Sequence, residues 1–215
     1  MNVFYLDTDP QRIASWLVDK HIVKMPVESA QMLSTAHRLL DGRRVGKDWI
    51  LPDEDISQPI CYKVAHAHHP STVWTMASKA NYEWHAQLWV CMLEEYTRRY
   101  GRIHNCSRLM DILMGAPKNI PDGPFTSPPL AMPQRYKSED AVSAYRRFYA
   151  GEKWRFARWK QADLPDWFLG EMQCVWLDEG YADRAVALEK AVRKKTPPMD
   201  VRVLSIAKEL TNEVA

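Results

Sequence analysis

The chain has 215 residues, of which 46% are apolar and 26% charged, and its formal net charge is +2. This length and composition suit one folded domain and exclude a disordered chain or a general polycation. No run of residues reaches the roughly 18 apolar residues of a membrane span. The N-terminus lacks the basic start and apolar core of a secretory signal. We therefore expect a cytoplasmic protein with no membrane partner.

The first part of the chain is predicted to be extended and then helical. Residues 2–6 have the pattern of a short strand or an extended lead-in. Asp9 followed by Pro10 is typical of a helix N-cap with proline at the first helical position. Apolar residues then recur at helical spacing over residues 19–40. Pro26 lies inside that stretch and is expected to kink the helix or to start a second one, because it has no N–H.

The middle of the chain combines an irregular segment with helices. Residues 41–70 are rich in Asp, Gly and Pro and are predicted to be irregular. Ser71 or Ser78 is expected to cap a long helix that ends at Gly101. Asn105 is expected to cap a shorter helix that follows it.

The C-terminal half begins with a long predicted surface loop over residues 115–137, which carry six prolines. The stretch Ser138-Glu139-Asp140 is expected to open a helix that runs to about Tyr149. Residues 151–170 are aromatic and basic, and the tail beyond them is predicted to hold further helices split by Pro197-Pro198.

These elements predict an all-α fold, a mostly helical, single compact domain with at most a short N-terminal strand. Residues 1–170 would form the domain and residues 171–215 a helical extension packed on it. The cysteines are far apart and form no C-x-x-C pair, which argues against a zinc ribbon or a disulfide framework. We expect reduced core thiols at Cys61, Cys91, Cys106 and Cys174.

Basic residues gather in segments, and acidic residues lie elsewhere. Such segregation can leave one cationic face that suits a phosphate backbone, although charge alone favours ordinary solvated helix faces. The basic segments contain Arg43, Arg44 and Lys47; Arg98, Arg99, Arg102 and Arg108; Arg146, Arg147, Lys153, Arg155, Arg158 and Lys160; and Arg193, Lys194 and Lys195.

The first predicted long helix contains a group of candidate catalytic residues. His21 and Glu28 are seven residues apart, close to two helical turns, and so lie on one side of the element. Lys20 and Lys24 share a face with each other. A carboxylate opposite C1′ of a nucleotide stabilises the positive charge that base excision builds on the sugar. An amine can attack the same carbon to give a Schiff base, so these residues are candidate catalytic groups.

The same residues carry a resemblance to a known family. Leu17-x-Asp19-x-His21 followed by Glu28 resembles the first helix of the bacteriophage pyrimidine-dimer DNA glycosylases, the endonuclease V family. The stretch is also similar to an abundant group of uncharacterised phage proteins. Further landmarks that resemble the family are His69-Pro70, Trp74, the run from Glu95 through Arg99 to Gly101, and Leu164-Pro165-Asp166-Trp167.

The resemblance implies roles for these residues and also shows departures. Glu28 would stabilise the developing cation, and His21 would position the DNA or transfer a proton. The family uses its own N-terminal amine, freed by removal of Met before a small residue, whereas position 2 here is Asn. Three possibilities follow: the amine of Met1 serves, Lys20 or Lys24 substitutes, or no Schiff base forms.

Dimer specificity is open because the arginines that flank the family's Glu are absent. Their places are taken here by Met25, Pro26, Val27 and Gln31.

Several residues outside the constellation are candidate DNA contacts. His66, His68 and His69 could bind a metal, but without a fourth donor we favour histidines that face the cleft or DNA, and we predict no metal and no cofactor. Asn81 is a candidate to read a flipped base. Interleaved basic and aromatic residues predict phosphate and base contacts. This set contains Arg146, Arg147, Lys153, Arg155, Arg158, Trp159 and Trp167.

The sequence therefore predicts an enzyme that binds double-stranded DNA, flips a pyrimidine and cleaves its N-glycosidic bond, with possible strand scission afterwards. If a phage encodes it, it would act in the host cytoplasm, and no obligate protein partner is inferred. Two alternatives remain. One is a phage DNA base-hypermodification enzyme on the same fold, and the other is a non-catalytic DNA-binding or anti-defence protein.

Overall fold

The computed structural model describes the whole chain except residues 53, 56, 180–181, 193–198 and 213–215. Within that part, helices dominate and the strands form a single two-stranded hairpin, so the all-α prediction is confirmed. The elements are α1 (Pro10–Trp16), α2 (Asp19–Asp41), β1 (Arg43–Val45), β2 (Asp48–Ile50), α3 (Pro70–Ala77), α4 (Lys79–Tyr100), α5 (Met110–Leu113), α6 (Ala141–Lys153), α7 (Asp166–Glu179), α8 (Ala182–Val192) and α9 (Val201–Asn212), with short 3-10 helices at Asn105–Leu109, Gln134–Tyr136 and Trp154–Phe156.

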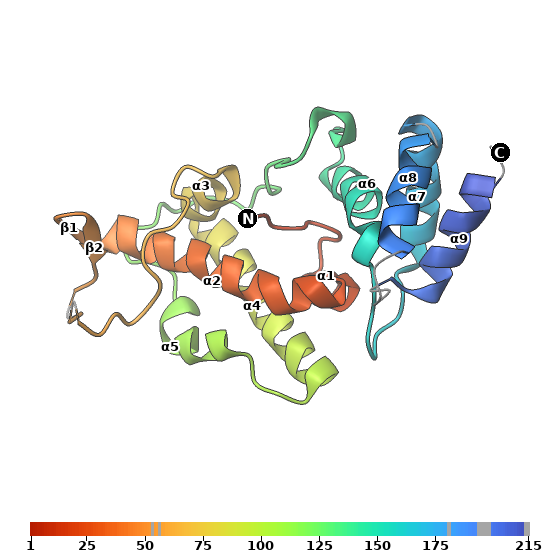
Figure 1. The fold of residues 1–215 in the computed structure, drawn as a ribbon. Coiled ribbons are helices and arrows are strands. Elements are labelled where there is room, and N and C mark those ends of the chain that lie inside the picture. The colour runs from red at the N-terminus through yellow and green to blue at the C-terminus, as the bar shows by residue number, and fades with distance from the viewer. Residues whose placement is uncertain (53, 56, 180–181, 193–198, 213–215) are drawn as a thin grey trace.

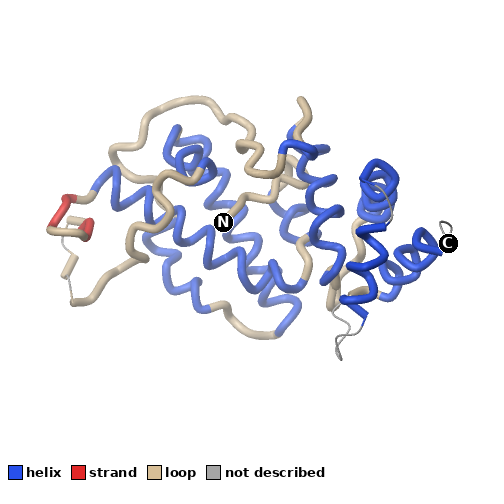
Figure 2. The backbone as a smooth tube through the Cα atoms, turned by 45° about the horizontal axis from the view of Figure 1, so that its top comes forward, coloured by secondary structure: helices blue, strands red, loops and turns tan. Residues whose placement is uncertain are grey.

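Helices α2 and α4 cross at the centre of the molecule, and the other elements are arranged around them (Figure 1). The hairpin lies at one end and helices α7 to α9 lie at the other (Figure 2). Helix α7 packs against α6, and α9 against α7. The predicted split at Pro197-Pro198 and the basic residues Arg193, Lys194 and Lys195 lie outside the described residues.

The N-terminal segment runs through the interior. Residues 2–6 are all buried and extended, and they form a lead-in and no strand. The N-terminus consequently lies in the middle of the molecule, beside α2 (Figure 1). Asp9 then caps α1 through its carboxylate, which accepts from the Gln11 N–H at 2.9 Å, and Pro10 is the first helical residue, as predicted.

Helix α2 continues through Pro26, so the proline neither ends it nor starts a second helix. Burial stabilises this arrangement: Pro26 lies in the core, and its carbonyl accepts a hydrogen bond from Trp89 Nε1 of α4 at 3.0 Å. Tertiary packing thus outweighs the missing N–H, as it often does for local propensity. Gly42 follows as the C-cap.

The prediction of an irregular segment after α2 was partly wrong, because β1 and β2 form an antiparallel hairpin. Its turn contains Gly46 at φ +61°, a left-handed conformation that favours glycine. Ser78 caps α4, and Gly101 ends it at φ +64°, both as predicted. The 3-10 turn that precedes α5 is capped by His104 and not by Asn105. Asp140 caps α6, which is one turn longer than predicted.

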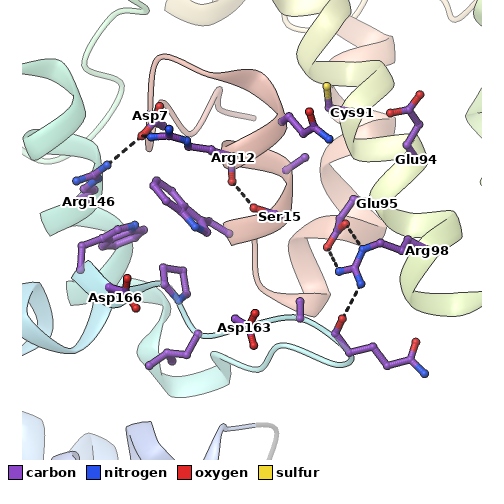
Figure 3. Close-up of a pocket in the computed structure, with 18 residues that line it drawn as sticks. Asp7, Arg12, Ser15, Cys91, Glu94, Glu95, Arg98, Arg146, Asp163 and Asp166 are labelled. Atoms are coloured by element: carbon purple, nitrogen blue, oxygen red, sulfur yellow. Dashed lines mark hydrogen bonds and ion pairs between the residues drawn. The ribbon is translucent and has the colours of Figure 1, made fainter.

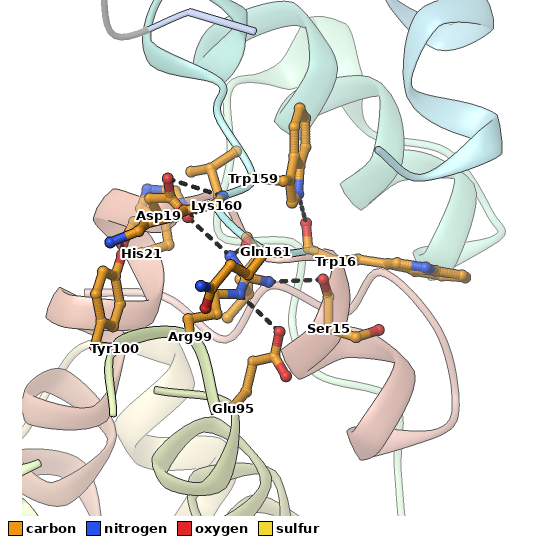
Figure 4. Close-up of polar contacts among 12 residues, drawn as sticks. Ser15, Trp16, Asp19, His21, Glu95, Arg99, Tyr100, Trp159, Lys160 and Gln161 are labelled. Atoms are coloured by element: carbon orange, nitrogen blue, oxygen red, sulfur yellow. Dashed lines mark hydrogen bonds and ion pairs between the residues drawn. The ribbon is translucent and has the colours of Figure 1, made fainter. Parts of the chain in front are cut away.

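A buried arginine fixes the junction between α1 and α2 (Figure 4). Arg99 of α4 is fully buried, and its guanidinium donates to the carbonyls of Ser15 and Leu17, both at 2.8 Å. It also bonds the carboxylates of Asp19 at 3.2 Å and Glu95 at 2.7 Å. Four partners for one buried cation satisfy its donors. The start of α2, which carries the candidate catalytic residues, is held in place in this way.

Replacing Arg99 by Met is expected to lower the free energy of unfolding by about 3–5 kcal/mol, because it leaves the Ser15 and Leu17 carbonyls without their donor and removes the buried cation that pairs with Asp19 and Glu95. Arg98 offers a matched control, since it binds the same Glu95 carboxylate at 2.7 Å but is 52% exposed. Arg98→Met should cost less than about 1 kcal/mol. Urea denaturation of both variants measures this difference, and equal losses would contradict the role assigned to Arg99.

Candidate active site

A carboxylate shared by two amines lies on α2. Glu28 is 14% exposed, and its Oε2 lies 3.4 Å from the N-terminal nitrogen of Met1. Its Oε1 lies 2.8 Å from Nζ of Lys24, one helical turn earlier. The Lys24 side chain is 65% exposed, whereas that of Met1 is 4% exposed. The α-amine therefore contacts the Glu28 carboxylate from the protein interior, and the Lys24 ammonium contacts it from the solvent side.

The side chains of the first two residues anchor this amine. The Met1 thioether accepts a hydrogen bond from Thr72 Oγ1 of α3 at 3.6 Å. Asn2 donates from Nδ2 to the Ala131 carbonyl at 2.9 Å and accepts at Oδ1 from the Tyr145 hydroxyl at 3.0 Å. These contacts come from helices and a loop far apart in the chain. They restrict where the α-amine can lie, which is the pre-organisation that a catalytic group needs.

His21, seven residues before Glu28 on α2, is buried. Its ring stacks on Phe4 of the N-terminal segment, with centroids 4.7 Å apart and planes at 12°. Its Nδ1 lies 2.7 Å from the Tyr149 hydroxyl of α6. That hydroxyl already accepts from the Val18 N–H at 3.0 Å, so we assign its proton to the bond with His21. The imidazole is then a neutral Nε2–H tautomer.

The electrostatic surroundings keep this imidazole neutral. Burial, and after it the nearby positive charges of Lys153, Lys24 and Lys20, lowers the pKa of His21 to about 3. Burial also lowers the pKa of Lys153, and Lys24 and Arg155 add to the effect while Glu152 opposes it. The residues around Glu28 therefore form a positively charged site that contains a neutral histidine.

A second buried histidine lies under the site. His85 of α4 donates from Nδ1 to Thr75 Oγ1 at 2.8 Å, since that hydroxyl itself donates to the Ser71 carbonyl. Its Nε2 accepts from Ser29 Oγ at 3.0 Å. Burial lowers the pKa of His85 to about 3. This network supports α2 at the residue next to Glu28.

The two histidines make stability depend on pH. Their pKa values in the folded protein, about 3, lie below the unfolded value of about 6.5, so the unfolded chain binds protons first as the pH falls. Stability is complete above pH 6.5 and is lost between pH 6.5 and 3, by up to about 1.4 kcal/mol per pH unit for each histidine. Urea denaturation between pH 7.5 and 5 measures the slope. In His85→Gln or His21→Gln, the slope of the unfolding free energy against pH should decrease by the contribution of one histidine, which is about half of what the two contribute together. An unchanged slope in both variants would contradict the assignment.

Of the predicted residues, the structure brings Glu28, Lys24 and His21 together, with Lys20 beside them. Lys153, expected to bind DNA from a separate basic segment, joins this group. So does His69, whose Nδ1 caps α3 by accepting from the Ser71 N–H at 3.2 Å. Its pKa is lowered by burial first and then by the Met1 amine and His66, while Glu28 opposes the shift.

Two predicted DNA contacts lie in the interior instead. Asn81 is buried, and its amide binds the Trp74 carbonyl at 3.1 Å and Thr126 at 3.1 and 2.8 Å, which ties the 115–137 loop to α4. Trp159 is buried, and its Nε1 donates to the Trp16 carbonyl at 2.9 Å. In this structure both side chains hold the fold together and neither is free to touch a base.

The remaining basic candidates lie on α6 or just after it, outside the site. Arg147 pairs with Asp178 at 2.5 Å, and Arg155 lies 3.7 Å from Glu152. Arg158 is exposed. These residues do not meet the Met1–Glu28 pair.

A large groove is separate from this site (Figure 3). Its volume is about 1030 Å³, and it lies between α1, α4, α6 and residues 161–167. The Arg146 guanidinium lies over the rings of Trp16 and Trp167, at 5.2 and 5.4 Å, and pairs with Asp7 at 3.3 Å. No residue that lines the groove belongs to the Met1–Glu28 site.

Within the described residues, no group of three or more His, Cys, Asp or Glu side chains is placed to hold a metal ion. All four cysteines are free; Cys61 and Cys106 are buried as expected, but Cys174 is exposed. None of the helices among the described residues is long and apolar enough to span a membrane.

The comparisons with known proteins give no relative. No family model, no curated protein and no solved structure matches this chain.

Phe4, Tyr149 and Thr72 were missed by sequence reasoning. Their role is to position other groups, and no local spacing signals it, because their partners lie up to 131 residues away.

Proposed function

We propose that this protein excises a pyrimidine from double-stranded DNA, with the α-amine of Met1 as nucleophile and Glu28 as the carboxylate that stabilises the cationic sugar. The observation that carries the proposal is the amine held 3.4 Å from a largely buried carboxylate. The motif resemblance at Leu17, Asp19, His21 and Glu28 supports it. No cofactor is needed for this chemistry.

The proposed reaction needs water as its only further reactant. The amine nitrogen bonds to C1′ while the bond from C1′ to the base nitrogen breaks, and the base leaves with a proton. Opening of the sugar ring gives a Schiff base, and loss of a C2′ proton then expels the 3′ phosphate. Water finally releases the amine. Glu28 stabilises the charge that develops at C1′.

An α-amine suits this role better than the neighbouring lysine. α-Amines are generally less basic than lysine side chains, so a larger fraction is unprotonated at neutral pH. The Met1 amine is also anchored through the buried Met1 and Asn2 side chains, whereas Lys24 is mostly exposed. Position and basicity both favour Met1.

The test is incubation with labelled duplexes that carry a cyclobutane dimer, uracil, 5-hydroxymethyluracil or no lesion, with and without borohydride. We expect base loss on one lesion and a borohydride-trapped adduct that maps to the Met1 peptide. No base loss and no adduct on any duplex would overturn the proposal and favour base modification or plain DNA binding. The expected site of action is the cytoplasm, that of the host if the protein is phage-encoded.

A further inference from the structure

One ring nitrogen of His21, Nε2, has no role in the proposed reaction. The ring is 7% exposed, and its Nδ1 is occupied by the Tyr149 hydroxyl. Nε2 has no hydrogen-bond partner among the described residues and is not among their fully buried, unpartnered polar atoms. It is therefore an open N–H donor on an otherwise buried ring. Such a donor is available to a ligand atom that accepts a hydrogen bond, and the surrounding side chains fix its direction.

The charges nearest that donor are the ammonium groups of Lys153, Lys24 and Lys20. The Lys153 ammonium makes no hydrogen bond or ion pair with the described residues, although the charge of Glu152 acts on it, and its Nζ lies 4.8 Å from the Phe148 ring and 5.9 Å from the Phe4 ring. Its neighbour Glu152 is engaged instead by Arg135 at 2.7 Å and by the Tyr136 hydroxyl at 2.8 Å.

Glu28 is the acid that remains beside these cations, and it already faces two amines. Lys20 adds a further exposed cation on the same side, with Nζ 4.8 Å from the Phe156 ring that also meets His21. A neutral N–H donor together with an unpaired half-buried ammonium is typical of a site for a tetrahedral oxyanion.

We propose that His21 Nε2 and Lys153 Nζ, with Lys24 at the rim, form a binding subsite for a phosphate group. Tyr149 is a positioning residue, because its hydroxyl proton leaves the N–H of His21 on the side that faces the ligand. The phosphate source that fits the proposed function is a DNA phosphodiester next to the excised nucleotide, and this part rests on that function.

The subsite can be tested with inorganic phosphate alone. Proton–nitrogen correlation spectra of the histidine rings, recorded at pH 7 and constant ionic strength, report the His21 tautomer and its response to phosphate. We expect a protonated Nε2 in the free protein and a saturable shift on titration. Lys153→Met should weaken phosphate about five- to ten-fold, since it removes one charge-assisted bond. Lys137→Met, which changes an exposed lysine outside the subsite, should leave the affinity for phosphate unchanged. No saturable shift, or equal affinity in Lys153→Met, would overturn the subsite.

Tyr149→Phe gives an independent readout of positioning. The His21 ring should then show a mixture of tautomers, whereas a purely structural tyrosine would leave the Nε2–H form unchanged. If this variant does not fold, the titration of the parent protein and Lys153→Met still decides the proposal.

Two further experiments distinguish phosphate binding at the subsite from the proposed catalysis. Glu28→Gln removes the acid of the site, so it should bind inorganic phosphate at least as tightly as the parent while its excision rate falls by a factor on the order of 10³. Retained phosphate binding without excision in the parent would overturn the proposed function and keep the subsite. Competition by a duplex with a tetrahydrofuran abasic analogue would assign the phosphate to DNA, and failure to compete would overturn that assignment in favour of free phosphate.

Discussion

Glu28→Gln is expected to lower the rate of base excision by a factor on the order of 10³, because a neutral amide cannot stabilise the positive charge on the sugar. The substitution keeps the shape of the side chain, and the lost ion pairs are partly exposed, so the fold should persist. Single-turnover cleavage of the lesion duplex that the parent processes measures the effect.

Glu83→Gln is the matched control. Glu83 also pairs with a lysine one turn away, Lys79 at 3.8 Å, but on the surface of α4. It should cleave at the parental rate. If Glu28→Gln retained activity within about tenfold of the parent, the carboxylate would not act on the reacting sugar, and the enzymatic proposal would fail.

A two-residue extension before Met1 is expected to abolish the borohydride-trapped adduct, with a loss of at least about a hundred-fold in trapping. The extension turns the Met1 nitrogen into an amide, which is not a nucleophile. It also moves the new amine by up to about 7 Å along the chain, away from the Glu28 carboxylate. Gel analysis of trapped protein–DNA complexes, with peptide mapping, provides the measurement.

The same extension placed at the C-terminus serves as the control and should leave trapping unchanged. Thermal unfolding of both proteins verifies that the N-terminal extension is tolerated beside the buried Met1 side chain. An adduct that persisted and mapped to Lys24 or Lys153 would show that a lysine is the nucleophile and would remove Met1 from the mechanism.

The landmarks of the family resemblance meet one another in the structure. Arg99 donates to the Leu17 carbonyl and to the Asp19 carboxylate, and it pairs with Glu95. Two stretches about 80 residues apart in the chain thus form one buried polar cluster at the start of α2. This part of the pattern is explained by folding alone, so the chemical argument rests on His21, Glu28 and Met1.

The sequence by itself determined the helical class and most helix ends, because these depend on local signals. Asp9 with Pro10, Ser78, Gly101 and Asp140 each act through hydrogen bonds or backbone angles within a few residues. It also placed His21 and Glu28 on one helix, since spacing within a helix fixes the direction of side chains.

Only the tertiary structure decided which of the candidate residues share a site. Lys153 and Tyr149 reach His21 from α6, and the N-terminus reaches Glu28 through the core, because burial of the extended 2–6 segment brings it there. The same packing enclosed Asn81, whose residue type had suggested a base contact. Such long-range pairings follow from how hydrophobic faces fit together, and periodicity along the chain does not encode them.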